Sequence, residues 1–120
     1  MFTPAPWLIC ISLFLDVYTP RNFTDKSALP VKVFIYGGSN IADGISDLLY
    51  DGCDIATSDA VFVSLNYRLG PLGWLALNNS NIRGNQAVGD ILLGLQWVQD
   101  NIKAFGGDPV SAWAYSCIGG

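Results

Sequence analysis

The sequence predicts an α/β protein in which a mostly parallel sheet packs against one long helix. Residues 31–36 and 60–67 are rich in β-branched and aromatic residues and carry at most one charge each, as in strands buried on both faces. A helical pattern over 86–105 and a third apolar run over 110–115 follow. Strand, loop, strand, helix and strand in this order are typical of a parallel α/β sheet.

The first part of this pattern is a strand over residues 13–18 (LFLDVY), which Thr19-Pro20 ends. A polar surface loop over 21–30 leads into the buried strand 31–36 (VKVFIY). Gly37-Gly38-Ser39-Asn40 then breaks that strand, because glycine favours a sharp turn over a continued ladder. We therefore expect two strands before residue 41, joined by an exposed loop.

The middle of the chain combines loops with one further strand. Residues 41–59 have a mixed pattern, and we expect a loop there with a single helical turn at 46–50. Residues 60–67 (AVFVSLNY) form the second buried strand. Glycine and proline punctuate 68–77, which predicts a loop, and polar residues make 78–85 turn-like.

The clearest element is the helix over residues 86–105. Asn85 is placed to cap its N-terminus, and Gly106-Gly107 follow its last turn as a C-terminal glycine pair does. Gly89 and Gly94 each cost a helix about 1 kcal/mol relative to alanine, so we expect them to allow close packing on the sheet. The apolar stripe is formed by Ile91, Leu95, Val98, Ile102 and Phe105, and the residues off the stripe are Asp90, Gln99, Asp100 and Lys103.

The composition argues against several classes of partner. The 120 residues are 51% hydrophobic and 13% charged, with a net charge of -4, and no basic run occurs. An acidic chain of this kind does not favour nucleic acid or an anionic membrane surface as a partner. Because the chain has no histidine and no CxxC spacing, the sequence predicts no metal site.

Three cysteines are present, Cys10, Cys53 and Cys117. Their odd number leaves one thiol over in an oxidising compartment. Three buried reduced thiols, or one disulfide with a free thiol, both remain open, and so does the pairing of Cys10 with Cys53.

The N-terminus and two glycosylation motifs bear on secretion. The apolar run 7–15 is shorter than the roughly 20 residues that span a bilayer. It has the length of the hydrophobic region of a signal peptide, but no Lys or Arg precedes it and no clean cleavage site follows. Two acceptor motifs for N-glycosylation give weak support to secretion, because such triplets also arise by chance: Asn22-Phe23-Thr24 and Asn78-Asn79-Ser80.

The order of local motifs is specific. Five segments follow one another: LFLDVYTP, LPVKVFIYGGSN, VFVSLNYRLGPLGWLAL, GNQAVGDILLGLQWVQDNIKAFGGDP and a Ser/Cys-Gly-Gly element. Together they resemble the type B carboxylesterase family, which includes fungal carboxylesterases and lipases and the cholinesterases, and the YGGSN form resembles the fungal branch. The resemblance covers residues 13–120 and leaves 1–12 as a divergent apolar N-terminus. It implies a partial α/β-hydrolase fold, with the N-terminal strands and one long helix, truncated at the nucleophile elbow.

The resemblance implies a small-molecule ester as substrate, no cofactor, and roles for residues at the ends of two strands. Gly37 and Gly38 match a loop that gives backbone N–H groups to the oxyanion hole. Ser116 matches the nucleophile when VSAW is matched to the family's strand, and Cys117 then adds an N–H to the oxyanion hole. Matching the terminal Gly-Gly instead makes Cys117 the nucleophile. Neither alignment keeps both elbow glycines: Ala114 and Ile118 stand there in the first, and Tyr115 stands at the first glycine in the second.

The chain contains no histidine and no glutamate, although a serine nucleophile normally needs a histidine base. In the family, the acid and the histidine come later in the domain than the segment that resembles this chain. We therefore expect an ester-hydrolase family but a truncated, inactive chain, and its standing as an enzyme is left open. The alternative is a non-catalytic interaction module of the same fold. The resemblance also implies a secreted protein.

Two further expectations concern packing. In relatives, a Ser-Glu-Asp-Cys element precedes the first strand, and its Glu pairs with the Arg of NYRLG. Ile9-Cys10-Ile11-Ser12 stand in that place here, which predicts that Arg68 has lost this expected partner and is left unpaired. The sheet is also expected to expose the edge of its last strand.

Overall fold

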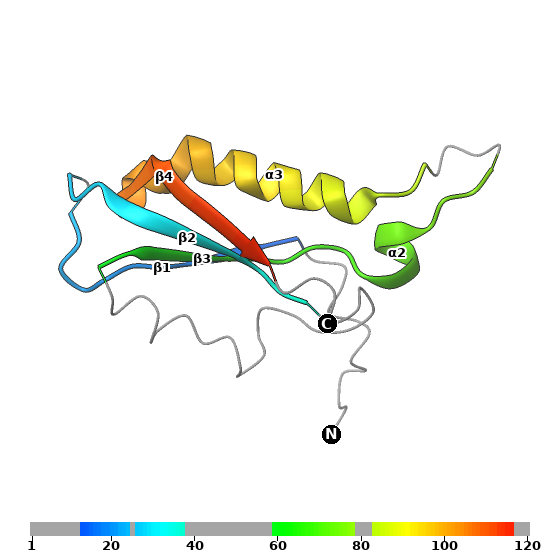
Figure 1. Cartoon of the computed structure of the whole chain (residues 1–120), viewed down its shortest axis with the longest axis horizontal. Helices are drawn as coiled ribbons and strands as arrows, with labels where there is room; N and C mark the ends of the chain where they lie inside the picture. The colour runs from blue at the N-terminus through cyan, green and yellow to red at the C-terminus, as the bar shows by residue number, and fades with distance from the viewer. Residues whose placement is uncertain (1–12, 25, 38–58, 79–82, 117–120) are drawn as a thin grey trace, which may run out of the picture.

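The computed structural model describes residues 13–24, 26–37, 59–78 and 83–116, and the structural statements below concern these residues. They form one four-stranded sheet in the order β1-β3-β2-β4, with a helical layer along one face (Figure 1). β2 pairs in parallel with β3 and β4, whereas β1 pairs antiparallel with β3. The predicted mostly parallel α/β sheet is confirmed, with one antiparallel edge strand. The strands are β1 (Leu15–Tyr18), β2 (Leu29–Ile35), β3 (Val61–Leu65) and β4 (Gly107–Ser116).

The two central strands carry the core. All five residues of β3 are buried, and so are Val31 and the run from Val33 to Ile35 in β2. This confirms the prediction that both strands are buried on both faces. Phe62 of β3 stacks with Phe34 of β2, with ring centroids 6.2 Å apart. The segment 1–12 and the helical turn expected at 46–50 lie outside the described residues.

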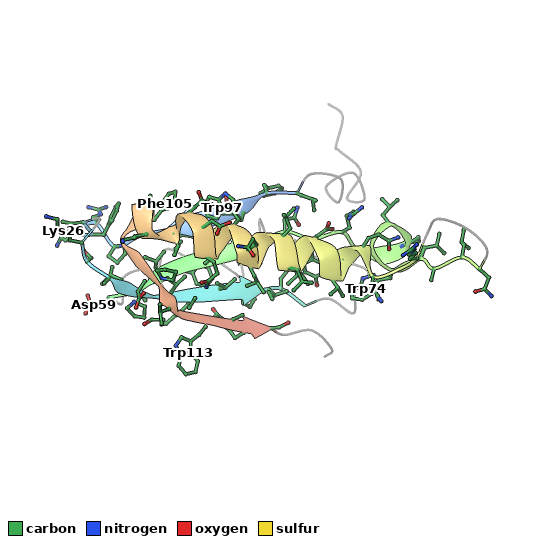
Figure 2. The ribbon with its side chains drawn as sticks, turned by 90° about the horizontal axis from the view of Figure 1, so that it is seen from above. Lys26, Asp59, Trp74, Trp97, Phe105 and Trp113 are labelled. Carbon is green, nitrogen blue, oxygen red and sulfur yellow. The ribbon has the colours of Figure 1, made fainter. Side chains whose placement is uncertain are left out.

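The helical layer consists of α3 (Gln86–Asn101), which continues into the 3-10 turn η3 (Ile102–Phe105) (Figures 1 and 2). The helix predicted over 86–105 is confirmed, with its last turn tightened. Val98 and Ile102 are buried against the sheet, and the other three stripe residues pack partly buried beside them. The ring of Trp97 lies next to that of Phe105 at the end of this layer, with centroids 6.0 Å apart (Figure 2).

Both ends of the helical layer are set by residues in the left-handed conformation. Asn85 precedes α3 with φ 60°, and its side chain makes no capping hydrogen bond. The predicted capping position is therefore right, but the side-chain cap does not form, because asparagine here uses its tolerance of left-handed backbone. Gly106 follows η3 with φ 77°, and its N–H donates to the Lys103 carbonyl oxygen at 3.1 Å. The glycine stop is confirmed.

The segment 68–77, which the sequence predicts to be a loop, contains the short helix α2 (Gly70–Trp74). Pro71 stands in its first turn, where a missing N–H leaves no intrahelical hydrogen bond unmade. A Cβ on Gly73 would collide with the Arg68 carbonyl oxygen, so this glycine permits the tight turn from β3 into α2. Glycine and proline punctuation therefore marks a helix start here.

β4 begins at Gly107, earlier than predicted, and it is not a buried strand. Val110 is 91% exposed and Trp113 is 75% exposed. β4 lies at one end of the sheet order, so it has a single neighbouring strand among the described residues. Figure 2 shows Trp113 pointing away from the sheet. The expected exposure of the last strand is confirmed, whereas the burial predicted from its apolar residues is wrong.

Gly89 and Gly94 provide a matched pair for testing helix packing. A Cβ on Gly94 would lie 3.0 Å from Leu65 Cδ2, whereas a Cβ on Gly89 would have nothing within 4 Å. Close packing, which the sequence predicts for both, occurs at Gly94 only. We expect Gly89→Ala to raise the free energy of unfolding by about 1 kcal/mol through helix propensity, and Gly94→Ala to gain less because Leu65 must move. Urea unfolding measures both variants, and equal gains would contradict the close contact at Gly94.

Candidate active site

The carboxyl ends of β2 and β4 bring two of the predicted site residues to one edge of the sheet. The strands are parallel, and Ile35 lies opposite Ser116. Gly37 comes two residues after Ile35 and is buried, whereas Ser116 ends β4 and is exposed. Ligand sites of open α/β sheets lie at such carboxyl ends. Gly38 and Cys117, the other predicted residues, lie outside the described residues.

The backbone of Ser116 is that of a strand. A nucleophile elbow presents its serine on a sharp, strained turn between strand and helix. Among the described residues other than glycine, positive φ occurs at Ala28 and Asn85, and Ser116 instead continues the pairing of β4 with β2. The nucleophilic role of Ser116 stays a prediction.

Two buried tyrosines join the ends of β2 and β3 next to Gly37. Tyr36 is 0% exposed and Tyr67 is 1% exposed, and their rings stack with centroids 4.7 Å apart. The Tyr67 hydroxyl donates to the Tyr36 carbonyl oxygen at 2.8 Å. The Tyr36 hydroxyl donates to Asn66 Oδ1 at 2.8 Å and contacts the Tyr67 carbonyl oxygen at 3.2 Å. Buried hydrogen bonds of this kind make the two strand ends a rigid unit.

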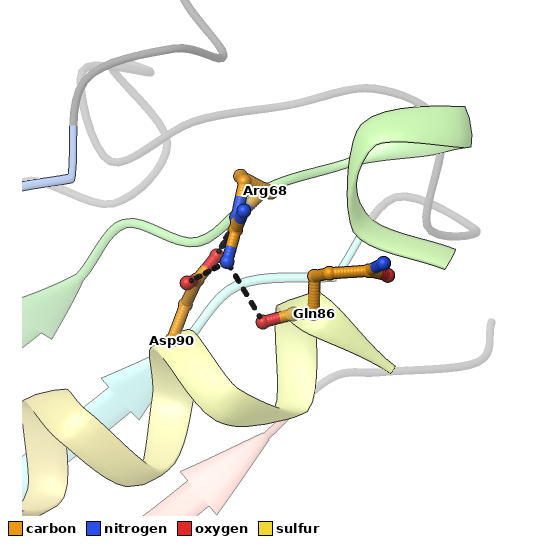
Figure 3. A network of polar contacts seen from close by, with 3 residues as sticks. All are labelled: Arg68, Gln86 and Asp90. Atoms are coloured by element: carbon orange, nitrogen blue, oxygen red, sulfur yellow. Dashed lines mark hydrogen bonds and ion pairs between the residues drawn. The ribbon is translucent and has the colours of Figure 1, made fainter. Parts of the chain in front are cut away.

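Arg68 follows this unit and is held by α3 (Figure 3). Its Nη2 lies 2.7 Å from Asp90 Oδ1, and its Nε donates to Asp90 Oδ2 at 2.7 Å. The Arg68 backbone N–H adds a hydrogen bond to Oδ2 at 3.1 Å, and Nη2 reaches the Gln86 carbonyl oxygen at 3.5 Å. The prediction that Arg68 is left unpaired is therefore wrong, because Asp90 in the second turn of α3 supplies a carboxylate. Residues 9–12, where relatives have the expected partner, lie outside the described residues.

The charges of this ion pair stabilise each other. Burial of the Asp90 carboxyl raises its pKa, because it penalises the charged form, but the hydrogen bonds and positive charge of Arg68 outweigh burial. The pKa of Asp90 therefore lies below its ordinary value. The hydrogen bond to Asp90 in turn raises the pKa of Arg68. The loop after β3 is thus tied to α3 by a pair that is ionised at neutral pH.

A second polar contact lies at the start of β4. The Ser111 hydroxyl donates to Asp108 Oδ2 at 2.7 Å, and the Val110 N–H donates to Asp108 Oδ1 at 3.0 Å. These two hydrogen bonds lower the pKa of Asp108. Because they lie at the opposite end of β4 from Ser116, they shape the entry to the strand and not the candidate site.

A largely apolar cavity of about 260 Å³ borders the ion pair. The charged side chain in its lining, Asp90, already binds Arg68. The cavity is lined by Leu13, Phe14, Leu15, Leu65, Asn66, Asp90, Leu93, Gly94 and Trp97.

In the described part of the chain, no group of three or more His, Cys, Asp or Glu side chains is arranged to hold a metal ion. No helix in those ranges is both long and apolar enough to cross a membrane.

The two predicted glycosylation sites are both exposed. Asn22 lies in a turn in which the Phe23 N–H donates to the Pro20 carbonyl oxygen at 3.1 Å. Thr24, which completes this motif, is exposed and shares a hydrogen bond of 3.0 Å with the Ser27 hydroxyl. Asn78 is exposed after α2, and the rest of its motif lies outside the described residues.

The sequence model of the carboxylesterase family matches residues 12–115. The chain belongs to the carboxylesterase family. It is 42% identical over 105 residues to the bile salt-activated lipase of Bos taurus, a match that covers 81% of this chain and 18% of the relative. It is 44% identical over 100 residues to liver carboxylesterase 1 of Mus musculus, covering 82% of this chain and 17% of the relative. The chain spans less than a fifth of the length of these relatives.

Family membership confirms the resemblance inferred from the motifs, and the sheet and helix agree with part of a carboxylesterase-family α/β fold. Sequence reasoning placed candidate site residues after β2 and at the end of β4, but it missed the contacts around the ends of β2 and β3. Each missed contact joins residues more than 20 positions apart: Tyr36 with Tyr67, and Arg68 with Asp90. The available signals were a tyrosine at the end of both predicted strands and an acid in the first half of the amphipathic helix.

Proposed function

We propose that this chain forms the N-terminal part of the catalytic domain of a serine ester hydrolase. The observation that carries the proposal is the parallel register in which Ile35 of β2 lies opposite Ser116 of β4. A nucleophile and an oxyanion site must both reach one reacting carbonyl, and this register supports such an arrangement at the ends of the two strands. In the proposal Ser116 attacks, with Cys117 as the alternative, and the oxyanion hole is formed by the N–H groups of Gly37, Gly38 and Cys117.

The substrate of the proposed reaction is a small carboxylic ester, and no cofactor takes part. Attack of Ser116 Oγ on the ester carbonyl forms a tetrahedral intermediate, whose negative oxygen accepts hydrogen bonds from the N–H groups. A base must take the hydroxyl proton, and these 120 residues contain no histidine. In the proposed domain the histidine and its acidic partner therefore come from outside these residues, and the chain alone has no efficient turnover.

The experiment is a chimera in which residues 13–117 replace the corresponding segment of mouse liver carboxylesterase 1, a relative 44% identical over 100 residues. We expect the folded chimera to hydrolyse p-nitrophenyl acetate and to react with a fluorophosphonate probe at Ser116. The 120-residue chain alone is the matched control and is expected to do neither. A folded chimera without ester hydrolysis would count against the proposal.

A non-catalytic interaction module of the same fold is the second candidate function. The absence of histidine favours it, and so do exposed apolar side chains on two neighbouring elements. A folded but inactive chimera, together with concentration-dependent association of the 120-residue chain, would support this candidate over the first. The exposed residues are Leu92 and Leu93 on α3 and Val110 and Trp113 on β4.

We also propose that the protein is a secreted glycoprotein of the fungal type, a proposal supported by the YGGSN form and the exposed motif at Asn22. Expressed in yeast behind a secretion leader, the chain is expected to shift in mass on treatment with an N-glycosidase. Asn22→Gln should reduce that shift, whereas Thr24→Ser, which keeps the acceptor motif, should preserve it. A secreted product of unchanged mass after treatment would contradict the glycosylation proposal.

A further inference from the structure

One face of α3 forms a wall of the apolar cavity next to β1. Residues of this face are spaced at i, i+3, i+4 and i+7, so they lie in one row along the helix. The row is distinct from the apolar stripe that packs on the sheet, because no stripe residue is among the described residues that line the cavity. The four residues of the row are Asp90, Leu93, Gly94 and Trp97.

The opposite wall is held in place by contacts between two strands. Leu15 of β1 lies opposite Leu65 of β3, and the Asn66 N–H donates to the Phe14 carbonyl oxygen at 3.0 Å. These contacts fix the start of β1 against the end of β3, at the end of the sheet order away from β4. Both walls therefore stand before any molecule enters, and a preformed site binds without the cost of ordering its walls.

The size of the cavity suits a small ring system. Gly94 lines the cavity without a side chain, and a Cβ there would lie 3.0 Å from Leu65 Cδ2. The missing side chain thus adds open volume where the helix meets the strand. A cavity of about 150 Å³ lined by similar apolar side chains is large enough for benzene. The volume of about 260 Å³ found here has room for two fused rings.

The lining also fixes the charge of a suitable guest. Among the described lining residues, the polar side chains are those of Asp90 and Asn66, and both are already engaged. Arg68 neutralises Asp90 at 2.7 Å, and Asn66 Oδ1 accepts a hydrogen bond from the Tyr36 hydroxyl at 2.8 Å. A charged guest would be desolvated beside a pair that is already neutral, which is costly. The cavity therefore favours an uncharged molecule, and the ring of Trp97 favours an aromatic one.

Several apolar side chains of the lining remain open to solvent. Phe14 is 41% exposed and Leu93 is 66% exposed, whereas Leu65 beneath them is 2% exposed. These side chains gather at one cavity and are not scattered singly, and a gathered apolar surface of this kind ordinarily marks a binding site. A guest in the cavity would remove part of this apolar surface from water, which is favourable.

We propose that the cavity between α3 and the start of β1 is a binding site for a small uncharged molecule with one or two aromatic rings. The site is separate from the candidate active site, because its described lining contains neither Gly37 nor Ser116. Binding here does not depend on the proposed ester hydrolysis, and the two can be tested independently.

The first test is a titration of the full 120-residue chain with indole, an uncharged molecule of two fused rings. The chain has four tryptophans, and Trp97→Phe identifies the side-chain N–H resonance of residue 97. We expect this resonance to shift and saturate with a Kd of about 1 mM or below. The resonance of Trp113, which lies on the opposite side of the molecule in Figure 2, should stay in place. An unmoved Trp97 resonance, or shifts of all tryptophans that rise linearly without saturation, overturns the inference.

The charge of the guest is tested with indole-3-acetate, which adds a carboxylate to the same ring system. We expect it to bind at least about tenfold more weakly than indole, because the carboxylate would lose water beside the Asp90–Arg68 pair. Equal affinities for the two molecules would contradict a site for uncharged guests.

Two matched pairs of variants on α3 locate the binding. Leu93→Ala should weaken indole binding by about fivefold, because a lining side chain is lost, whereas Leu92→Ala removes a similarly exposed leucine outside the lining and should have no effect. Gly94→Ala should also weaken binding, because its methyl group takes up part of the cavity. Gly89→Ala, whose methyl group meets nothing within 4 Å, is its control. Full affinity in folded Leu93→Ala and Gly94→Ala chains overturns the inference.

Discussion

Replacing Ser116 by alanine in the chimera is expected to lower kcat for p-nitrophenyl acetate by about a thousandfold or more. Without the hydroxyl no acyl-enzyme can form, and only binding and the oxyanion N–H groups are left to act on the carbonyl. Release of p-nitrophenol measures the rate, and loss of fluorophosphonate labelling provides an independent readout of the same side chain.

Cys117→Ala is the matched control for this prediction, because the two alignments of the sequence leave open which residue attacks. If Ser116 is the nucleophile, Cys117→Ala keeps most of the activity, since only the backbone N–H of residue 117 takes part. The reverse pattern would assign the nucleophile to Cys117. An active chimera in which neither substitution lowers kcat would contradict both alignments.

The central elements could be predicted from the sequence because their local pattern and their burial agree. β3 is an unbroken apolar run, and it lies between β1 and β2 with all five residues buried. The end of the helical layer at Gly106 was also predictable, because a left-handed residue at that point favours glycine for local steric reasons. The family was also predictable, because the order of its local motifs can be recognised in the sequence without knowledge of the fold.

The burial of β4 was not predictable, because burial depends on which neighbours a strand has and not on its composition. Val110 and Trp113 are as apolar as residues of β3, yet they are mostly exposed, on a strand that has one neighbouring strand in the described part of the chain. The ion pair was missed for a similar reason. Asp90 is a charged residue on an amphipathic helix, and such residues ordinarily face solvent. Only the fold brings Arg68, 22 residues earlier in the sequence, into contact with it.

Removing Arg68 is expected to destabilise the chain more than removing the charge of Asp90. We expect Arg68→Gln to lower the free energy of unfolding by about 3 kcal/mol and Asp90→Asn by about 1–2 kcal/mol. The Asp90 side chain is 5% exposed and that of Arg68 is 38% exposed. Arg68→Gln therefore leaves a buried carboxylate without its cation, whereas Asp90→Asn leaves a guanidinium that water can reach. Urea unfolding at neutral pH measures both, and Asp100→Asn, on the exposed side of the same helix, is the control.

The pH dependence of stability distinguishes an effect of the Arg68 charge from an effect of packing, because the Asp90 pKa is shifted in opposite directions with and without the Arg68 side chain. In the unsubstituted chain the pKa of Asp90 is lowered, so its contribution to stability is present above the unfolded pKa of about 3.9 and is lost as the pH falls through the folded pKa.

Without the Arg68 side chain, burial is the largest remaining influence, and we expect the pKa of Asp90 to rise. Arg68→Gln should then gain stability relative to the unsubstituted chain as the pH falls from neutral, because protonation of the buried carboxyl becomes favourable in the folded state. Differences between variants cancel the contribution of Asp108, which is common to all of them. Parallel acid curves for Arg68→Gln and the unsubstituted chain would show that the stabilisation does not come from the charge of Arg68.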